Sequence, residues 1–339
     1  ELRAAIAGGV TKFVCPPDTN PVLDEPGLVE MFIKRSSLYN KARLYPLGAL
    51  TVGLSGEMIT EMAELSESGC IGFSQSNESI KDTNVLLKAF QYASNFNFPV
   101  WLSPMDFWLK KSGSIHEGMV STRLGLNGIS SCAESISLMT IIELAKLTKV
   151  KLHICRVSSE RGVSLVRNAK LEGLKITADV AVHHLHMTEI DVGEFNTNSK
   201  VIPPFRTKRD CEALGNGLID GTIDCICSDH TPVSQDAKNL PFSNADPGVI
   251  GLELLLPLTL DWAKKKNLTI PEAISFITSK PAEIIGVDKF TVEHNKKANL
   301  CIFDPNCTWI VNENNLFSQG KNTPFYGFEL SGKVKATIS

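Results

Sequence analysis

The sequence has few of the features typical of secreted, membrane or nucleic-acid-binding proteins. No CxxC motif occurs, and the nine cysteines lack the spacing of a disulfide framework, which favours a reducing compartment and a cytoplasmic location. No apolar run is long enough to span a bilayer, and we expect no signal peptide. The net charge of -3 includes no long basic or acidic run, which disfavours nucleic acid and anionic membranes as partners.

The chain also lacks an initiating methionine. Its opening residues, ELRAAIAGG, are typical of the last turns of a helix that ends on glycine. We therefore expect that further residues precede Glu1 in the natural protein.

Short apolar or β-branched runs alternate with longer amphipathic stretches through residues 11–228. This alternation is typical of a parallel sheet with helices packed outside it. The strand candidates are Thr11–Cys15, Arg43–Leu50, Cys70–Ser74, Pro99–Ser103, Val150–Cys155, Lys175–Val180 and Thr222–Ser228. The helix candidates are Glu25–Ser36, Asn84–Ser94, Ala133–Leu147, Glu160–Ala169 and Lys208–Leu218.

The pattern predicts an α/β fold, a (β/α)₈ barrel that lacks its first strand in this chain. The structural alternative is an open, doubly wound sheet. Such a sheet usually carries a glycine-rich phosphate turn after its first strand, whereas Cys15 is followed here by Pro16, Pro17 and Asp18. The barrel is the preferred prediction.

The periodicity changes after the last barrel strand. Val249–Lys264 and Ile270–Ile277 are predicted helices, and three short strands are predicted beyond them. The division that follows is a barrel over residues 1–285 and a small β domain over residues 286–339, completed by the preceding residues that this chain lacks. The three strand candidates are Asn299–Pro305, Thr308–Val311 and Gly332–Ile338.

An ordered set of motifs resembles the dihydroorotase family of the amidohydrolase superfamily. Their order along nearly the whole chain makes the resemblance much more specific than any single motif. The motifs are AGGVT at 7–11, PDTNP at 17–21, PPFR at 203–206, SDHTP at 228–232, DPGVIGLE at 246–253, and FDP and NTPFYG at 303–305 and 322–327.

The resemblance implies interconversion of carbamoyl aspartate and dihydroorotate, a cyclic amide. Members of the family use one or two zinc ions, which polarise the amide carbonyl and lower the pKa of water. The metal ligands lie at the C-terminal ends of the barrel strands. They are a His-x-His pair on the first strand, which this chain does not contain, then residues on the fourth, fifth, sixth and eighth strands.

Three of the four visible metal positions are substituted. Gln75 stands where the family has an acidic residue or a carboxylated lysine, and Ser103 stands where it has a histidine. Arg156 replaces the next histidine, and a guanidinium has no free lone pair for a metal. Asp229 alone is retained, and one carboxylate does not make a zinc site. We therefore predict no metal cofactor and a vestigial Asp229 that pairs with Arg156 across the barrel mouth.

The substrate positions are changed as well. Asp18 replaces an asparagine that binds the substrate carboxylate, and its negative charge would repel that carboxylate. Ile202 replaces the asparagine before the two prolines, and Val233 replaces a histidine that contacts substrate. The losses thus fall on metal and substrate positions together.

The remaining histidines offer weaker candidates. His153 is an odd number of residues from Arg156, so strand alternation predicts opposite faces and a packing role. His183, His184 and His186 form an imidazole cluster after the seventh strand, and such clusters bind zinc readily. The family has a similar cluster that is not its metal site, so a ligand role is not the preferred interpretation.

Three functions remain open on the sequence. The preferred one is a non-catalytic member that assembles with aspartate transcarbamoylase, because residues 115–126 and 179–181 resemble a bacterial group of dihydroorotase-like chains with that role. The alternative is an active zinc-dependent dihydroorotase or related cyclic amidohydrolase. A third is a barrel that binds a metabolite without converting it.

Overall fold

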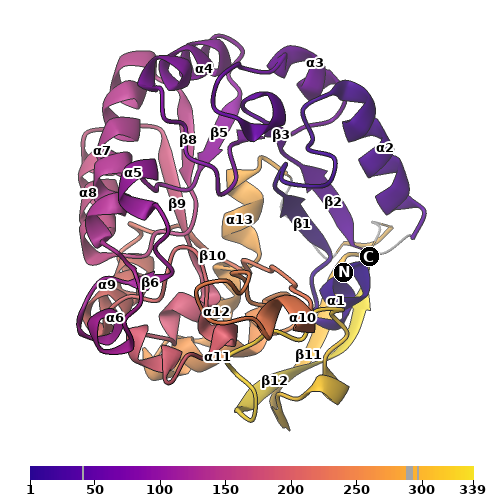
Figure 1. Ribbon diagram of the computed structural model, residues 1–339. Helices are drawn as coiled ribbons and strands as arrows, with labels where there is room; N and C mark the ends of the chain where they lie inside the picture. Colours follow the sequence, from indigo (N-terminus) through magenta and orange to yellow (C-terminus); the bar gives the residue numbers. More distant parts are fainter. Residues whose placement is uncertain (40–41, 288–292, 296–297) are drawn as a thin grey trace.

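The computed structural model describes residues 1–39, 42–287, 293–295 and 298–339. Parallel strands surround its centre, and most of the helices lie outside them (Figure 1). This arrangement is the α/β barrel expected from the alternation of strands and helices. The barrel strands are β1 (Lys12–Cys15), β2 (Arg43–Pro46), β3 (Gly48–Ala49), β4 (Phe73–Ser74), β5 (Pro99–Leu102), β8 (Lys151–Ile154), β9 (Ile176–Ala181) and β10 (Cys225–Cys227).

The predicted strand Arg43–Leu50 is divided at Leu47. Its first part, β2, pairs in parallel with β1, and its second part, β3, pairs in parallel with β4. The second sheet has the order β10-β9-β8-β5-β4-β3. All seven predicted strands are therefore present, and among the described residues no strand pairs β1 with β10.

The outer helices place their apolar faces on the sheet. In α7 the buried residues Leu138, Ile141 and Ile142 follow the three- and four-residue spacing of one helix face. Neighbouring helices α4, α7, α8 and α9 pack in sequence order around the outside (Figure 1). The helices on this outer layer are α2 (Pro26–Ser37), α3 (Met62–Glu67), α4 (Thr83–Asn95), α7 (Ser131–Thr148), α8 (Glu160–Leu171) and α9 (Lys208–Ile219).

The connection between β5 and α7 carries structure that the sequence did not predict. Two short strands, β6 (Ile115–His116) and β7 (Gly128–Ile129), pair in parallel beside α5 (Phe107–Lys110) and α6 (Met119–Leu124). A separate apolar cluster that contains Ile115, Val120, Val192 and Phe242 supports this extension. The elements are too short for a periodic signal in the sequence.

The predicted helix Val249–Lys264 begins later than expected, and α11 is Leu255–Lys265. Val249 forms a parallel bridge with His230, and the amide of Thr231 donates to the carbonyl of Val249 at 2.9 Å. Gly251 lies so close to the backbone of Ser228 that a Cβ atom would collide with it. Residues 249–254 are therefore held against the end of β10 and do not enter the helix.

The C-terminal region contains two antiparallel strands, whereas the sequence predicted three. β11 (Leu300–Ile310) runs through the first two predicted segments, with an irregularity between Asp304 and Thr308, and pairs with β12 (Glu329–Ile338). The hairpin packs on α11 and on α1 (Leu2–Ala7), which ends at Gly8 as expected. The boundary after residue 285 stays a prediction, because residues 288–292 lie outside the described ranges.

Three short helices complete the described regular structure, apart from single 3₁₀ turns. They are α10 (Gln235–Lys238), α12 (Ile270–Ser275) and α13 (Ser279–Ile284). Within the described ranges, no helix is both long enough and apolar enough to cross a membrane.

Candidate functional site

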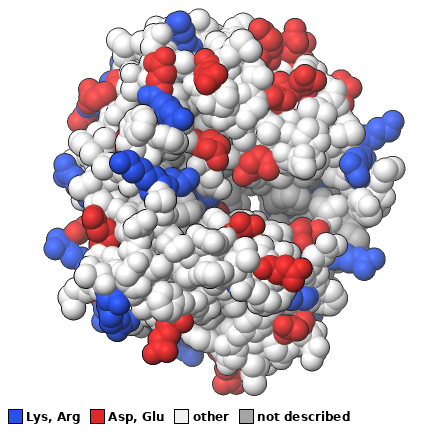
Figure 2. Space-filling model, in the orientation of Figure 1, with Lys and Arg blue, Asp and Glu red and all other residues white. Residues whose placement is uncertain are grey.

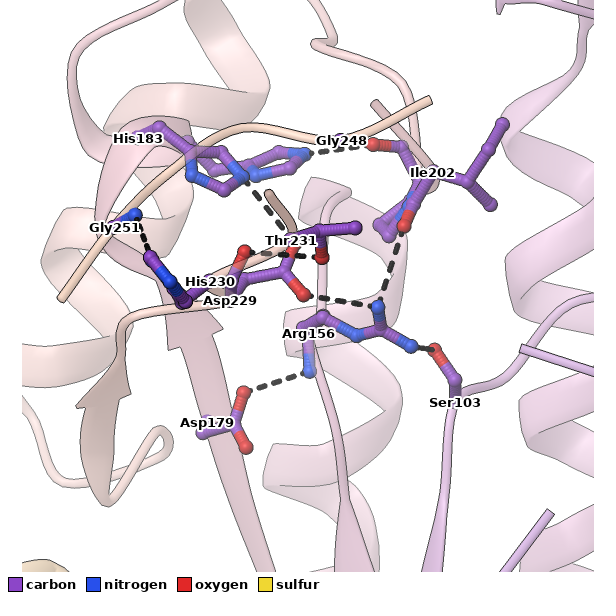
Figure 3. Close-up of polar contacts among 12 residues, drawn as sticks. Ser103, Arg156, Asp179, His183, Ile202, Asp229, His230, Thr231, Gly248 and Gly251 are labelled. Atoms are coloured by element: carbon purple, nitrogen blue, oxygen red, sulfur yellow. Dashed lines mark hydrogen bonds and ion pairs between the residues drawn. The ribbon is translucent and has the colours of Figure 1, made fainter. Parts of the chain in front are cut away.

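Arg156 is the centre of a group of polar contacts at the barrel mouth (Figure 3). Its Nη1 lies 3.0 Å from Oδ1 of Asp229, which confirms the ion pair expected from the sequence. Its Nη2 donates to the Ser103 hydroxyl at 2.8 Å and to the side-chain carbonyl of Asn77 at 2.6 Å. Nη1 also lies 3.5 Å from the carbonyl oxygen of Ile202. The guanidinium is thus held by groups from four parts of the chain.

Arg156 and Asp229 both have left-handed backbone conformations, which orient their side chains toward each other. Arg156 follows the end of β8 with φ of 55°, and Asp229 follows the end of β10 with φ of 42°. Such backbone angles are uncommon outside glycine and often occur at functional sites. The amide of Arg156 donates to Oδ1 of Asp179 at 2.8 Å, which fixes the turn after β8. Asp179, in β9, was not predicted from the sequence as a site residue.

The environment keeps both partners charged. Burial alone would raise the pKa of Asp229, but the charge of Arg156 and the nearby His183 outweigh it and hold the pKa well below its usual range. Burial would lower the pKa of Arg156, and the Asp229 carboxylate together with Cys155, Cys227 and Asp179 more than offsets this effect. The side chains of both residues are 13% exposed, so water screens the pair only weakly.

Gln75 does not join this group of contacts. It is 1% exposed, its Oε1 accepts from the hydroxyl of Thr51 at 2.9 Å, and its Nε2 donates to the carbonyl of Leu54 at 2.8 Å. Both ends of the amide are therefore used to fix the loop after β3. A bridging carboxylate would be unable to make the second of these bonds.

The three substituted substrate positions contact different parts of the chain. Asp18 is exposed and lines a cavity beside the mouth. The carbonyl of Ile202 faces Arg156, and its bond to Pro203 is cis. The amide of Val233 donates to Oδ1 of Asn322 at 2.9 Å, so the C-terminal region holds this loop.

His153 is buried and lies in a second cluster inside the barrel. One ligand atom from each of His153, Cys155 and Asp179 lies within 4.8 Å of the others, so the three could hold a metal ion. In the described structure Nε2 of His153 is 2.8 Å from Asp179, and Nδ1 is 2.8 Å from the hydroxyl of Thr177. Burial and the nearby Asp179 carboxylate raise the pKa of the Cys155 thiol well above its usual value, so the thiol is protonated when no metal is bound.

His153 is buried, as its predicted packing role requires, but strand alternation does not relate it to Arg156, which lies outside the strand. β8 ends at Ile154, and the left-handed turn at Arg156 breaks the alternation. As a result, His153 and the backbone of Arg156 both contact Asp179. Local strand periodicity does not extend through such a turn.

The three clustered histidines do not converge on one point. Nε2 of His183 lies 3.5 Å from Oδ2 of Asp229, whereas His184 contacts the carbonyl of Pro203 at 3.1 Å. His186 contacts the carbonyl of Leu258 at 2.9 Å. Of the three, only His183 approaches the Arg156–Asp229 pair.

A buried carboxylate behind the mouth also escaped the sequence analysis. Glu134 is fully buried in α7 and accepts hydrogen bonds from the amides and hydroxyls of Ser158 and Ser159. Arg206, from the PPFR motif, donates to the Ser158 hydroxyl at 3.3 Å and to the carbonyl of Ile129 at 2.7 Å. This network holds the segment that follows Arg156.

The protein families that match the chain agree with this architecture. The family described as "Amidohydrolase family" matches residues 117–339, and the one described as "Dihydro-orotase-like" matches residues 1–162. The fold and the strand-end site therefore define a barrel of the amidohydrolase class.

Curated relatives narrow the class further. A protein named "Dihydroorotase" from Geobacter metallireducens is 37% identical over 336 residues, which cover 99% of this chain and 79% of that protein. A "Dihydroorotase-like protein" from Pseudomonas aeruginosa is 36% identical over 338 residues, covering 100% of this chain and 80% of that protein. The chain belongs to the dihydroorotase family, which includes the dihydroorotase-like proteins.

The similarity to solved structures supports only the fold, because their sequence identities to this chain are low. An L-hydantoinase from Arthrobacter aurescens aligns with a TM-score of 0.84 at 22% identity, covering 99% of this chain and 78% of that one. A dihydroorotase from Saccharomyces cerevisiae, in complex with 5-fluoroorotic acid, aligns with a TM-score of 0.75 at 18% identity, covering 100% and 92%.

Amidohydrolases are typically metal-dependent, and the donor set at this mouth does not fit a zinc ion. Tetrahedral zinc is held by at least three imidazole, thiolate or carboxylate ligands. Here Asp229 forms an ion pair with the permanently charged Arg156, and Ser103 offers only a hydroxyl, which accepts from the same guanidinium. The side chain of Gln75 is neutral and is hydrogen-bonded to Thr51. A cation at this point would also face the guanidinium.

Proposed function

We propose that this chain is a dihydroorotase-like protein of pyrimidine biosynthesis that is catalytically inactive and acts as a structural partner of aspartate transcarbamoylase. The observation that carries the proposal is the ion pair between Arg156 and Asp229, 3.0 Å long, at the position where the family binds metal. A fixed guanidinium supplies positive charge for Asp229, but it cannot generate hydroxide from water as a metal does.

The pattern of substitution supports the same interpretation. Metal and substrate positions are changed at Gln75, Ser103, Arg156 and Asp18, while the motifs that hold the barrel together persist. Asn322 of the NTPFYG motif, for example, bonds both the carbonyl of Thr231 and that of Gly248 at 2.9 Å. Retained architecture without retained chemistry is what an assembly role requires.

The first experiment measures zinc in the full-length protein after loading with zinc and desalting, together with hydrolysis of dihydroorotate. We expect less than stoichiometric zinc and no turnover above the uncatalysed rate. One or two tightly held zinc ions accompanied by turnover would show that the chain is an active hydrolase.

The partner is tested separately. The full-length protein is mixed with the catalytic chain of aspartate transcarbamoylase from the same organism and analysed by light scattering during gel filtration. We expect a complex of defined mass, and an unrelated trimeric enzyme serves as the control. Separate elution of the two proteins at micromolar concentration would contradict the partner proposal and leave the inactivity proposal standing.

The alternative is an active metal-dependent cyclic amidohydrolase. It is favoured by the cluster of His153, Cys155 and Asp179, which could hold a metal ion inside the barrel, and by relatives named "Dihydroorotase". Zinc that is retained by the wild type and lost in a Cys155→Ser variant would support this alternative.

A further inference from the structure

The outward face of α7 carries large apolar side chains. Ile136, Met139 and Leu147 are 42%, 40% and 69% exposed and follow the three- and four-residue spacing of one helix face. The exposed positions in the body of the outer helices α4 and α9 are polar instead, at Lys88, Gln91, Asn95, Glu212 and Asn216. The opposite face of α7 is buried against the barrel. A helix that is apolar on both faces is normally covered on both, which indicates contact with another molecule.

The apolar surface continues onto α5. The amide of Asp106 donates to the carbonyl of Ala133 at 2.8 Å, which holds the start of α5 against the first turn of α7. Trp108 and Leu109 of α5 are 63% and 41% exposed. Exposed apolar surface bordered by polar groups is typical of protein contacts, and tryptophan is enriched among the residues that carry binding energy. Together the two helices form one surface, the α7 face, which consists of Trp108, Leu109, Ile136, Met139 and Leu147.

Basic side chains border the α7 face. Lys111 follows α5, Lys149 lies at the C-terminal end of α7, and Arg161 lies in the first turn of the adjacent α8. All three are exposed, and none forms an ion pair with another described residue. Figure 2 shows basic side chains gathered over α5. These charges are therefore available to a partner.

The carboxylates of Glu143 and Glu172 do not offset this basic border. Nζ of Lys146 lies 2.8 Å from Oε1 of Glu143 and 2.8 Å from Oε2 of Glu172, so one ammonium is shared between them. A second copy of the chain would bring the same basic border against itself, and like charges disfavour such a contact. The complementary occupant is a protein surface with an apolar strip bordered by carboxylates.

We propose that the α7 face is the docking surface for a partner protein whose contact region is apolar and bordered by Asp and Glu side chains. This inference rests on the proposed assembly with aspartate transcarbamoylase, whose catalytic chain is taken as the partner. The apolar residues form the buried centre of the contact and the basic residues form its rim, which is the usual anatomy of a protein interface.

Two methionines of equal exposure test the surface. Met139→Glu places a charge in the α7 face, whereas Met31→Glu makes the same change on α2, where the methionine is 41% exposed. Binding of each full-length variant to the transcarbamoylase catalytic chain is measured by isothermal titration calorimetry. We expect Met139→Glu to weaken binding about tenfold or more and Met31→Glu to leave it within about twofold of the wild type. Equal affinities of the two variants would overturn the docking surface and leave the partner proposal standing.

The charge of the border is tested separately. Lys149→Glu reverses a charge beside the α7 face and should weaken binding about three- to tenfold, and the affinity of the wild type should fall as the salt concentration rises. Lys264→Glu reverses an exposed charge on α11 and should leave the affinity unchanged. An unchanged affinity in Lys149→Glu would refute the acidic chemistry of the partner. Thermal unfolding checks that all four variants fold, since each replaces an exposed side chain.

Two further results would overturn the proposal. Dimers of the chain alone in sedimentation velocity, if abolished by Met139→Glu, would show that a second copy covers the α7 face. The absence of any complex between the wild type and the transcarbamoylase chain would overturn the partner proposal and this inference together.

Discussion

The guanidinium of Arg156 lies 3.0 Å from the carboxylate of Asp229, although 73 residues separate the two along the chain. Each residue follows the C-terminal end of a barrel strand, so the fold brings both to one edge of the sheet. The pair joins the ends of β8 and β10, at positions that the resemblance to the family assigns to metal ligands. The ion pair occupies these positions and also links the ends of the two strands.

Removal of one partner should destabilise the protein. Arg156→Met leaves the Asp229 carboxylate buried without its counter-charge, so the free energy of unfolding should fall by about 3 kcal/mol. The double variant with Asp229→Asn should regain most of the loss, as measured by urea denaturation. Arg167→Met is the control, because its ion pair with Asp220 is 40% and 45% exposed and should contribute less than about 1 kcal/mol. Equal losses in both single variants would contradict this account.

A metal site should be recoverable. Replacing Ser103→His and Arg156→His together removes the guanidinium and places two imidazoles beside Asp229, which makes the three protein ligands that a catalytic zinc site needs. We expect about one zinc per chain in this double variant by atomic absorption. Ser103→His alone retains the guanidinium and should bind none. Zinc in the single variant would show that Arg156 does not exclude the metal.

The buried side chain of Glu134 leaves no room for a Cβ atom at Gly162 in the neighbouring helix. A Cβ atom on Gly162, in the first turn of α8, would collide with Oε1 of Glu134. Gly162→Ala should therefore lower the free energy of unfolding by about 2 kcal/mol or more. Gly27→Ala, in the first turn of α2 with no atom within 4 Å of the new Cβ, should stabilise by about 0.5–1 kcal/mol. Thermal denaturation of both variants tests the contrast, and a stable Gly162→Ala protein would contradict it.

A buried histidine should make stability depend on pH. Burial and the charge of Lys265 lower the pKa of His186 to about 4, below its usual value of 6.5. As the pH falls, His186 is protonated in the unfolded chain before it is protonated in the folded protein. The stability that the neutral, buried imidazole contributes is therefore fully present above pH 6.5 and is lost between pH 6.5 and 4. The difference corresponds to about 3 kcal/mol.

Urea denaturation at several pH values measures this effect. His186→Gln keeps a donor for the carbonyl of Leu258 but does not titrate, so its stability should fall less between pH 7 and 4 than that of the wild type. His294→Gln, at an exposed position, should retain the wild-type dependence. Parallel profiles for wild type and His186→Gln would refute the assignment.

Elements with a long periodic pattern were predicted from the sequence, whereas very short or interrupted elements were not. Long periodic segments such as α7 and α8 were predicted within a few residues, because their buried faces repeat every three or four residues. β6 and β7 were missed because each has two residues and no apolar run marks it. The split at Leu47 was missed because it falls inside one apolar run. The three predicted C-terminal strands became two because pairing with β12 continues past an irregularity in β11.

The candidate site was predictable where a motif gave the position. The substitutions at Gln75, Ser103 and Arg156 and the retained Asp229 followed from the resemblance, and the pairing of Arg156 with Asp229 was expected from their opposite charges. Asn77, Asp179 and Glu134 were not predicted as site residues, and only the tertiary structure places them next to the segment around Arg156. Their contacts join residues 23 to 79 positions apart.

By itself the sequence determined the repeating βα architecture and the residue type at each family position, since periodicity and chemical type are local properties of a chain. It also determined that a guanidinium and a carboxylate would remain at the mouth. Only the tertiary structure decided what these groups touch: the left-handed turns after β8 and β10 aim Arg156 and Asp229 at each other, and a cavity forms beside them. Distances between side chains depend on how distant segments pack, and a linear pattern does not contain that information.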